Sequence, residues 1–166
     1  EGVNSGSDSE PDKDEGVNNA DNAEEPASFD MTKLNAEDLE KGVLTNLPFS
    51  IGTPFSDIQA QWGIPVDEDY MRGGKYQQYT YGDYDFYFFD PDASETVTGI
   101  QINPNTPVTM DEIREALGTP DIDELDEMLS NTWSLMYKYE NYTVFVVGTS
   151  EDKNSEVAYM FLKSGQ

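Results

Sequence analysis

The sequence predicts an α+β fold, in which two tandem helix–β-meander repeats form an antiparallel sheet with helices packed on one face. Two observations predict it: a short helix ending in Gly-x-Pro occurs twice, and so does a tyrosine-rich hairpin. A third is the aromatic content of ten Tyr, eight Phe and two Trp, which is ample for the core of a 166-residue chain. We therefore expect one folded domain over residues 29–166, with repeats at about 51–104 and 105–163.

The first recurring element is a helix of two turns. Residues 56–65 align with residues 111–120, and both segments close with Gly-x-Pro. A glycine just past the end of a helix and a proline soon after it are common termination signals. Ser56 and Thr109 are the expected N-caps, because a hydroxyl oxygen accepts a hydrogen bond from a free N–H of the first turn.

The second recurring element is a hairpin followed by a third strand. Residues 79–86 and 137–144 share the pattern Tyr-x-Tyr-x-x-Tyr, and residues 97–102 align with 157–162. Turns at residues 82–83 and 140–141 fix the register, and the register decides which side chains face the core. The expected core residues are Tyr79, Tyr81, Tyr84, Phe86, Phe88, Leu135, Tyr137, Tyr139, Tyr142, Val144 and Val146, together with Ile100, Ile102, Met160 and Leu162.

Three other segments complete the expected organisation. Residues 1–28 hold nine acids, one Lys and no aromatic residue, a composition that predicts a disordered acidic leader. A short helix should follow, with Asn35 as its N-cap and Gly42 near its end. Residues 121–129 carry Ile122, Leu125 and Leu129 at helical spacing, which favours an acidic amphipathic helix over the sheet.

Charge and composition exclude several classes of function. The chain has 34 acids against 9 bases, a net charge of −25, which argues against nucleic acid as a partner. There is no Cys and no His, so thiol nucleophiles, Ser-His-Asp triads and the usual zinc sites are excluded. We expect no catalytic residue, no metal and no cofactor. No run of about 18 apolar residues is present, so no transmembrane segment is expected in this chain.

The second face of the predicted sheet indicates a binding surface. An antiparallel sheet with one solvated face normally carries polar residues there. Several aromatic residues would instead point to that face, and they are the predicted binding residues: Tyr87, Phe89, Phe145, Tyr159 and Phe161. Two alternatives stay open: the N-terminal arm covers the face, or a bulge turns some of these residues inward.

Part of the sequence resembles a known family. Residues 48–53 (Pro-Phe-Ser-Ile-Gly-Thr), the helix ending in Trp62-Gly63-x-Pro65 and the tyrosine-rich hairpin resemble the YjgB-like family. These are secreted or lipid-anchored Gram-positive proteins built on a domain of unknown function, and the likeness covers about residues 30–163. The Gly-x-Pro helix followed by a meander is more distantly similar to β-lactamase inhibitor protein and to BamE-type envelope lipoproteins. No catalytic residues follow from this resemblance.

Two hypotheses about function follow. The first is an extracellular or cell-surface binding or inhibitor-like module, non-enzymatic, whose aromatic sheet face contacts an unknown protein or cell-wall ligand. A lipidated Cys upstream of Glu1 would anchor it, and the leader would then be a spacer; otherwise the leader is a solvated tail. The second hypothesis is a carboxylate-dependent hydrolase of envelope polysaccharide, for which residues 67–69 and Asp83 with Asp85 are the nearest carboxylate clusters. The oligomeric state stays open.

Overall fold

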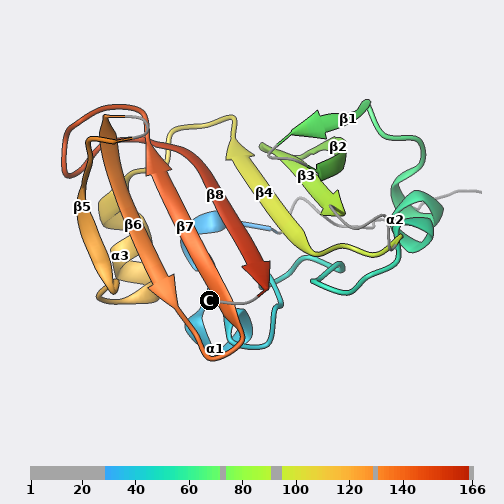
Figure 1. Cartoon of the computed structure of the whole chain (residues 1–166), viewed down its shortest axis with the longest axis horizontal. Helices are drawn as coiled ribbons and strands as arrows, with labels where there is room; N and C mark the ends of the chain where they lie inside the picture. Colours follow the sequence, from blue (N-terminus) through green and yellow to red (C-terminus); the bar gives the residue numbers. More distant parts are fainter. Residues whose placement is uncertain (1–28, 72–73, 91–94, 129–130, 165–166) are drawn as a thin grey trace, which may run out of the picture.

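An eight-stranded antiparallel sheet dominates the structure, a computed structural model that describes residues 29–71, 74–90, 95–128 and 131–164 (Figure 1). The acidic leader expected over residues 1–28 lies outside the described residues. The sheet order is β1-β2-β3-β4-β8-β7-β6-β5. The strands are β1 (Asp67–Met71), β2 (Gly74–Tyr81), β3 (Tyr84–Asp90), β4 (Gly99–Pro104), β5 (Ile122–Asp126), β6 (Thr132–Lys138), β7 (Tyr142–Gly148) and β8 (Val157–Ser164).

The order of elements along the chain is a helix followed by four strands, and it occurs twice. The first half runs from α2 (Phe55–Trp62) to β4, and the second half from α3 (Met110–Leu117) to β8. The two halves meet where β4 pairs with β8, in the middle of the sheet. In Figure 1, α3 and the N-terminal segment lie behind the strands of the second half, whose other face is toward the viewer.

The two helices begin differently and end alike. Thr109 caps α3: its hydroxyl accepts from Glu112 N at 3.3 Å, and the Glu112 carboxylate accepts from Thr109 N at 3.0 Å. The prediction for Ser56 is wrong, because α2 begins at Phe55 after Pro54 and has no side-chain cap. Gly63 and Gly118 end the helices with φ values of 84° and 86°, a region that glycine enters without steric cost.

Both outer strands of the sheet differ from expectation. Residues 121–128 do not form the expected helix, because Ile122–Asp126 is the edge strand β5 and pairs with β6, while Leu129 lies outside the described residues. The apolar residues at helical spacing are separated there onto different faces, since Ile122 lies opposite Met136 and Leu125 opposite Trp133. Strand β1 at the other edge was not expected at all. Both edge strands are rich in acids, and charged edge strands resist pairing with other chains.

The predicted hairpin registers are confirmed. Tyr81 pairs with Tyr84 and Tyr79 with Phe86 around the turn at residues 82–83. In the second hairpin Tyr139 N donates to Tyr142 O at 2.8 Å across residues 140–141. The registers place the expected residues on the core side, and Ile100, Ile102, Met160 and Leu162 are completely buried beneath the central strands.

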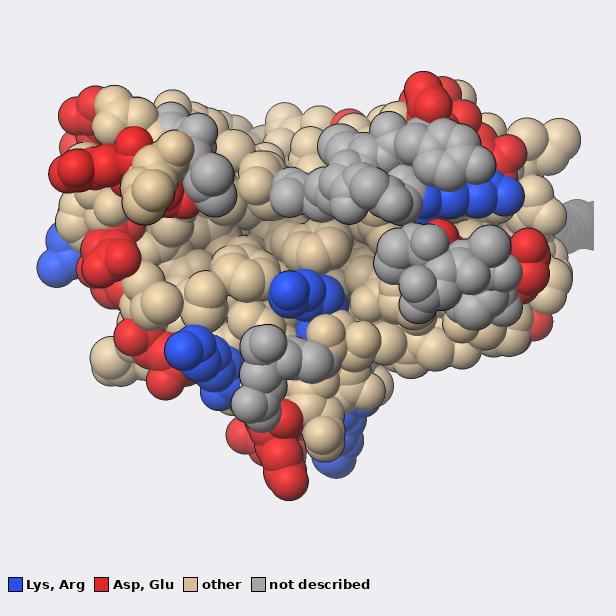
Figure 2. Space-filling view, viewed as in Figure 1, with Lys and Arg blue, Asp and Glu red and all other residues tan. Residues whose placement is uncertain are grey.

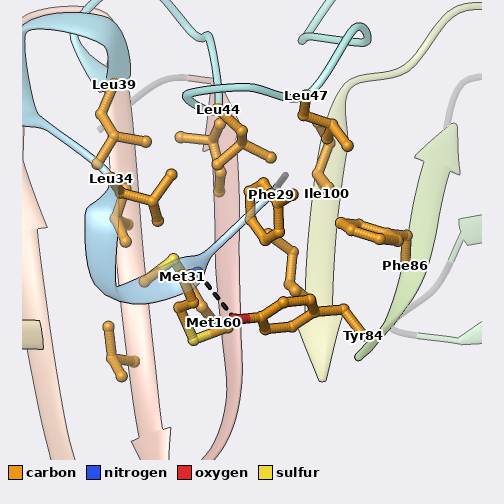
Figure 3. Packing of buried hydrophobic residues seen from close by; sticks show 14 of the residues in the cluster. Phe29, Met31, Leu34, Leu39, Leu44, Leu47, Tyr84, Phe86, Ile100 and Met160 are labelled. Atoms are coloured by element: carbon orange, nitrogen blue, oxygen red, sulfur yellow. Dashed lines mark hydrogen bonds between the residues drawn. The ribbon is translucent and has the colours of Figure 1, made fainter. Parts of the chain in front are cut away.

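The N-terminal segment closes the core on the helix side. It contains the short helix η4 (Met31–Lys33) and α1 (Ala36–Leu39), and Asn35 caps α1 by accepting from Asp38 N at 2.7 Å, as predicted. Figure 3 shows Phe29 and Met31 against the core side of the sheet. The Phe29 ring meets that of Tyr84 at 5.0 Å, and Met31 N donates to the Tyr84 hydroxyl at 2.9 Å.

Candidate binding surface

The open face, as we name the side of the sheet opposite the core, carries one continuous row of residues across all eight strands. Each member lies directly opposite the next on the neighbouring strand. Because paired residues of antiparallel strands project to the same side, their side chains form one line. The central row is Asp67, Gln78, Tyr87, Gln101, Phe161, Phe145, Met136 and Ile122.

The predicted binding residues all belong to the open face, with unequal exposure. Tyr87, Phe145, Tyr159 and Phe161 are half-buried, so part of each ring faces outward. Phe89 is only 4% exposed, because Tyr76 and Phe161 pack around it with ring centroids at 5.7 and 5.5 Å. Phe89 therefore supports its neighbours and offers little surface to a partner.

A glycine shapes the middle of this face. Gly99 lies between Phe89 and Lys163 in the row next to the central one. A Cβ atom on Gly99 would lie 2.9 Å from Cζ of Phe161, so the ring of Phe161 occupies the space that a side chain would take. An aromatic ring over a strand glycine restores packing that the missing side chain would supply.

Charges are unevenly distributed over the open face. Figure 2 views the molecule from this side: uncharged residues cover its middle, a few basic side chains lie among them, and most acidic residues lie around the periphery. Lys163 Nζ lies 5.6 Å from the centroid of the Phe145 ring, a distance at which a cation is attracted to the ring face. Thr143 separates Lys163 from the exposed Lys138 in the same row.

The described part of the N-terminal arm does not cover the open face. Phe29, Met31 and Leu34 are buried in the core on the opposite side of the sheet (Figure 3). The register change between Val147 and Gly148 lies at the far end of β7, beyond Phe145, so it does not turn the predicted residues inward. Among the described residues, several aromatic rings of the open face pack against one another.

A recess of about 180 Å³ lies on another part of the molecule, between the end of α2 and β2. Gln61, Trp62, Tyr79, Thr80 and Tyr81 line it, and none of these is a carboxylate. The carboxylate pair that the hydrolase hypothesis requires is therefore not at this recess. Within the described ranges no group of three acidic residues is arranged to hold a metal ion.

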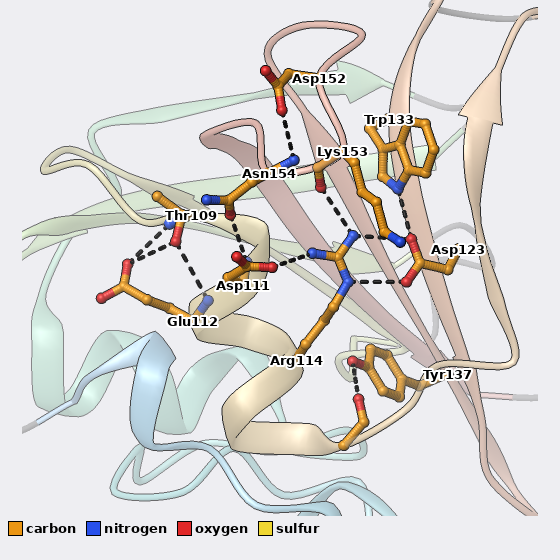
Figure 4. Close-up of polar contacts among 11 residues, drawn as sticks. Thr109, Asp111, Glu112, Arg114, Asp123, Trp133, Tyr137, Asp152, Lys153 and Asn154 are labelled. Carbon is orange, nitrogen blue, oxygen red and sulfur yellow. Dashed lines mark hydrogen bonds and ion pairs between the residues drawn. The ribbon is translucent and has the colours of Figure 1, made fainter.

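A network of hydrogen bonds around Arg114 holds α3 to the second half of the sheet (Figure 4). Arg114 donates to both carboxylate oxygens of Asp123 at 2.9 Å, to Asp111 at 2.7 Å and to the Lys153 carbonyl at 2.9 Å. Trp133 Nε1 donates to Asp123 at 2.7 Å. The hydrogen bond from Arg114 keeps the pKa of the Asp123 carboxyl below its usual value. Since the guanidinium donors are used within the fold, this cluster is a structural clamp.

Together the fold and the open face define a mixed α+β domain with an aromatic sheet surface. A family model for a domain of unknown function, DUF4309, matches residues 32–162. The chain belongs to the DUF4309 family. This agrees with the expected likeness to YjgB-like proteins.

The structure is similar to solved structures of two bacterial proteins. The first is a DUF4309 protein, YjgB of Bacillus subtilis, with a TM-score of 0.64 and 16% identity over 84% of this chain and 97% of that chain. The second is a cysteine-rich secretory protein of Staphylococcus aureus, with a TM-score of 0.46 and 10% identity over 68% of this chain and 44% of that chain. No curated protein matches the chain significantly. No helix in the described part of the chain is long and apolar enough to cross a membrane.

Proposed function

We propose that this chain is a non-enzymatic binding module that acts outside the cytoplasm and presents its open face to a protein or cell-wall partner. The observation that carries the proposal is the row of half-buried aromatic residues over the central strands. Apolar surface that a fold leaves accessible in one continuous patch is typical of binding sites. Lys163 beside Phe145 adds a cationic group to that patch, and aromatic residues are enriched in interfaces.

The arrangement of the fold supports an inhibitor-like mode of presentation. We propose that the two halves are tandem repeats, each placing its helix on the core side and its strands on the open face. In both halves the first tyrosine of the hairpin donates to the carbonyl of the helix-ending glycine, Tyr79 to Gly63 at 3.2 Å and Tyr137 to Gly118 at 2.8 Å. Such pairing of repeats builds one wide sheet from two small units, which leaves a broad face for a partner.

We also propose that the chain is secreted or lipid-anchored in a Gram-positive cell envelope. The resemblance to YjgB-like proteins supports this location, and so does the acidic composition of residues 1–28, which suits a spacer. The full precursor tests it: a signal peptide that ends in a small-residue motif followed by Cys is expected just before Glu1. A precursor without an export signal would contradict this location.

The test of the binding face replaces three open-face residues together. Tyr87→Thr, Phe145→Thr and Tyr159→Thr retain strand propensity while removing the rings. The parent and the triple variant, both immobilised, are exposed to native envelope extract and to purified peptidoglycan. We expect retention of a partner by the parent and at least about tenfold less by the triple variant.

A stability measurement is needed beside the binding test. The triple variant should have a much higher Tm than the core variant Phe88→Thr, because Phe88 is completely buried. If the triple variant unfolds as readily as Phe88→Thr, the three rings belong to the core and the open face is not the binding site. Undiminished binding by a folded triple variant would also contradict the proposal.

A further inference from the structure

The recess at the end of α2 is a surface separate from the open face. Its main walls are the rings of Trp62 and Tyr81, which meet at a centroid distance of 4.4 Å and an angle of 76°. Tyr79 forms its floor from the core side, and its ring lies 5.6 Å from that of Trp62. At about 180 Å³ the recess is smaller than a typical drug-sized pocket of about 300 Å³ or more, so it suits one side chain or one small ring.

The rim of the recess carries exposed aliphatic side chains. Ile64 is 87% exposed and Val66 64%, and with Met128 they are the large hydrophobic residues that the described chain exposes most. Two hydrogen bonds hold this segment beside β2: Val66 N donates to Gln78 O at 2.8 Å, and Tyr79 Oη donates to Gly63 O at 3.2 Å. The backbone on both sides of Ile64 is therefore held beside β2, close in the chain to Trp62 of the recess.

The second half of the chain shows that the fold does not need these apolar residues. Gly118 has nearly the same backbone angles as Gly63, and Tyr137 bonds to it as Tyr79 bonds to Gly63. At the positions of Trp62, Ile64 and Val66, however, the second half has Leu117, Thr119 and Asp121. Thr119 and Asp121 are exposed, as are their counterparts. The same local backbone is thus compatible with polar residues, and only the first half exposes apolar ones.

An uncovered stretch of strand runs along the recess. β1 begins opposite Gln78, so residues 79–81 of β2 extend past the last pair of that edge strand. Backbone groups in an antiparallel strand point alternately to its two neighbours. Since Gln78 O faces Val66, the N–H and C=O of Thr80 also point away from β3, toward the recess. An extended peptide could hydrogen-bond there by strand addition.

The charge around the recess limits the kind of peptide. Asp67 follows Val66, and Asp85 accepts a hydrogen bond from the Thr80 hydroxyl at 2.6 Å. Glu68 on the same edge strand is already paired with Lys75 at 3.5 Å. The recess itself is lined by no basic residue. A second copy of this chain, with its net charge of −25, would be repelled here, whereas a basic segment would be attracted.

From this geometry we infer that the recess is a docking site for an extended basic peptide segment of a partner protein. One bulky apolar side chain of the peptide enters the recess and packs against the rings of Trp62 and Tyr81, flanking apolar groups contact Ile64 and Val66, and Lys or Arg residues face the surrounding acids. The backbone of the peptide pairs with β2 at Thr80. The peptide side chain supplies most of the affinity, because desolvated anchors in small pockets dominate peptide interfaces.

The test uses the full chain as bait for a library of short random peptides displayed on phage, followed by synthesis of the selected peptides. We expect selected sequences to combine a large apolar residue with Lys or Arg and to bind with Kd on the order of micromolar. The double variant Ile64→Thr and Val66→Thr makes both positions polar, as they are in the second half, without adding a charge that would attract a basic peptide. It should weaken binding at least about tenfold. Met128→Thr, which removes an equally exposed apolar side chain elsewhere, should leave binding unchanged.

Nuclear magnetic resonance locates the binding site, because the chain has two tryptophans and hence two indole N–H signals. Trp133 Nε1 is bonded to Asp123 in the second half and serves as the internal reference. Trp62→Leu, which copies Leu117, assigns the signals by deleting one. We expect the selected peptides to shift the Trp62 signal while the Trp133 signal stays in place.

Four outcomes would overturn the inference. The first is a library that yields no binding peptide, or only acidic ones. The second is equal binding by the parent and by the double variant Ile64→Thr, Val66→Thr. The third is a Trp62 signal that does not move with peptide but moves with a chito-oligosaccharide, which would make the recess a sugar site. The fourth is concentration-dependent self-association that the double variant abolishes, which would make the occupant a second copy.

Discussion

The ring of Tyr142 lies directly against the backbone of Gly42. A Cβ atom on Gly42 would be 2.6 Å from Cζ of Tyr142, and Gly42 has a φ of +77°. Gly42 follows α1 in the N-terminal segment, and Tyr142 is the first residue of β7. This contact therefore fixes the N-terminal segment to the second half of the sheet.

Gly42→Ala is expected to lower the free energy of unfolding by about 2 kcal/mol or more, from backbone strain and from the clash with Tyr142. Gly52→Ala is the matched control: its φ is +97°, yet a Cβ there would meet nothing within 4 Å. Urea unfolding compares the two. Equal losses would mean that the contact with Tyr142 contributes nothing.

Gly99→Ala tests how the open face is packed. The added methyl group would press on the Phe161 ring, and we expect a loss of about 1–3 kcal/mol, typical of overpacking. Phe161→Leu in the same chain shortens the obstructing side chain, so the double variant should be more stable than the sum of the single losses allows. Thermal unfolding of the parent, the two single variants and the double variant measures this. Stability losses that simply add would show that the Phe161 ring does not lie over Gly99 in solution.

Tyr137 should make stability decrease at alkaline pH. Burial raises its pKa to about 12, so folding favours the protonated phenol that donates to Gly118 O at 2.8 Å. The folded pKa is above the ordinary value of 10, so the contribution is complete below pH 10 and is lost as the pH rises toward 12. Tyr139, whose pKa burial also raises to about 12, acts in the same direction.

Tyr137→Phe should lower stability at neutral pH by about 1 kcal/mol, the value of one hydrogen bond, and should flatten the decrease above pH 10. Tyr81→Phe removes one phenol as a control. Chemical unfolding at several pH values provides the measurement. A pH profile unchanged by Tyr137→Phe would contradict the assigned role.

Asp123 should govern part of the stability at acid pH. The hydrogen bond from Arg114 lowers its carboxyl pKa from 3.8 in spite of burial. A depressed pKa means that the stabilisation is present above the unfolded value and is lost as the pH falls through the folded value. The dependence therefore lies below about pH 4.

Asp123→Asn is expected to cost about 1–3 kcal/mol at neutral pH, because the half-buried donors of Arg114 and Trp133 lose a charged acceptor. Its stability should also vary less with pH below about pH 4 than that of the parent. Glu124→Gln, an exposed neighbour on the same strand, is the control and should behave as the parent does. An Asp123→Asn protein with the parental acid profile would show that the Arg114 contact does not govern the acid dependence.

Local signals account for the features that were predictable from the sequence. Thr109 with Glu112 is a capping box, and Gly82 with Asp83 is a strong hairpin turn, so their structures depend on neighbours in the chain. The prediction of Ser56 as the N-cap was wrong because Pro54, two residues earlier, occupies the N-cap position and α2 begins at Phe55. The helix prediction for residues 121–129 rested on the spacing of only three apolar residues. Backbone pairing of Ile122–Asp126 with β6 outweighs so weak a pattern.

The recess was missed for a different reason. Trp62 and Ile64 fit the core or loop roles that their positions suggest, and exposure of Ile64 depends on how the segment after α2 lies against β2. A signal was nevertheless present in the aligned helices, where Ile64 and Val66 stand opposite Thr119 and Asp121. Apolar residues at aligned positions that are polar in the other copy are candidates for interface residues.

The place of β8 has a consequence for biosynthesis. β8 follows the other seven described strands along the chain and is therefore synthesised after them, yet it lies between β4 and β7 in the middle of the sheet. Until it emerges, the first half exposes the bonding edge of β4 and the second half that of β7. Deletion of residues 157–164 would therefore divide the sheet into two halves, each with an open bonding edge.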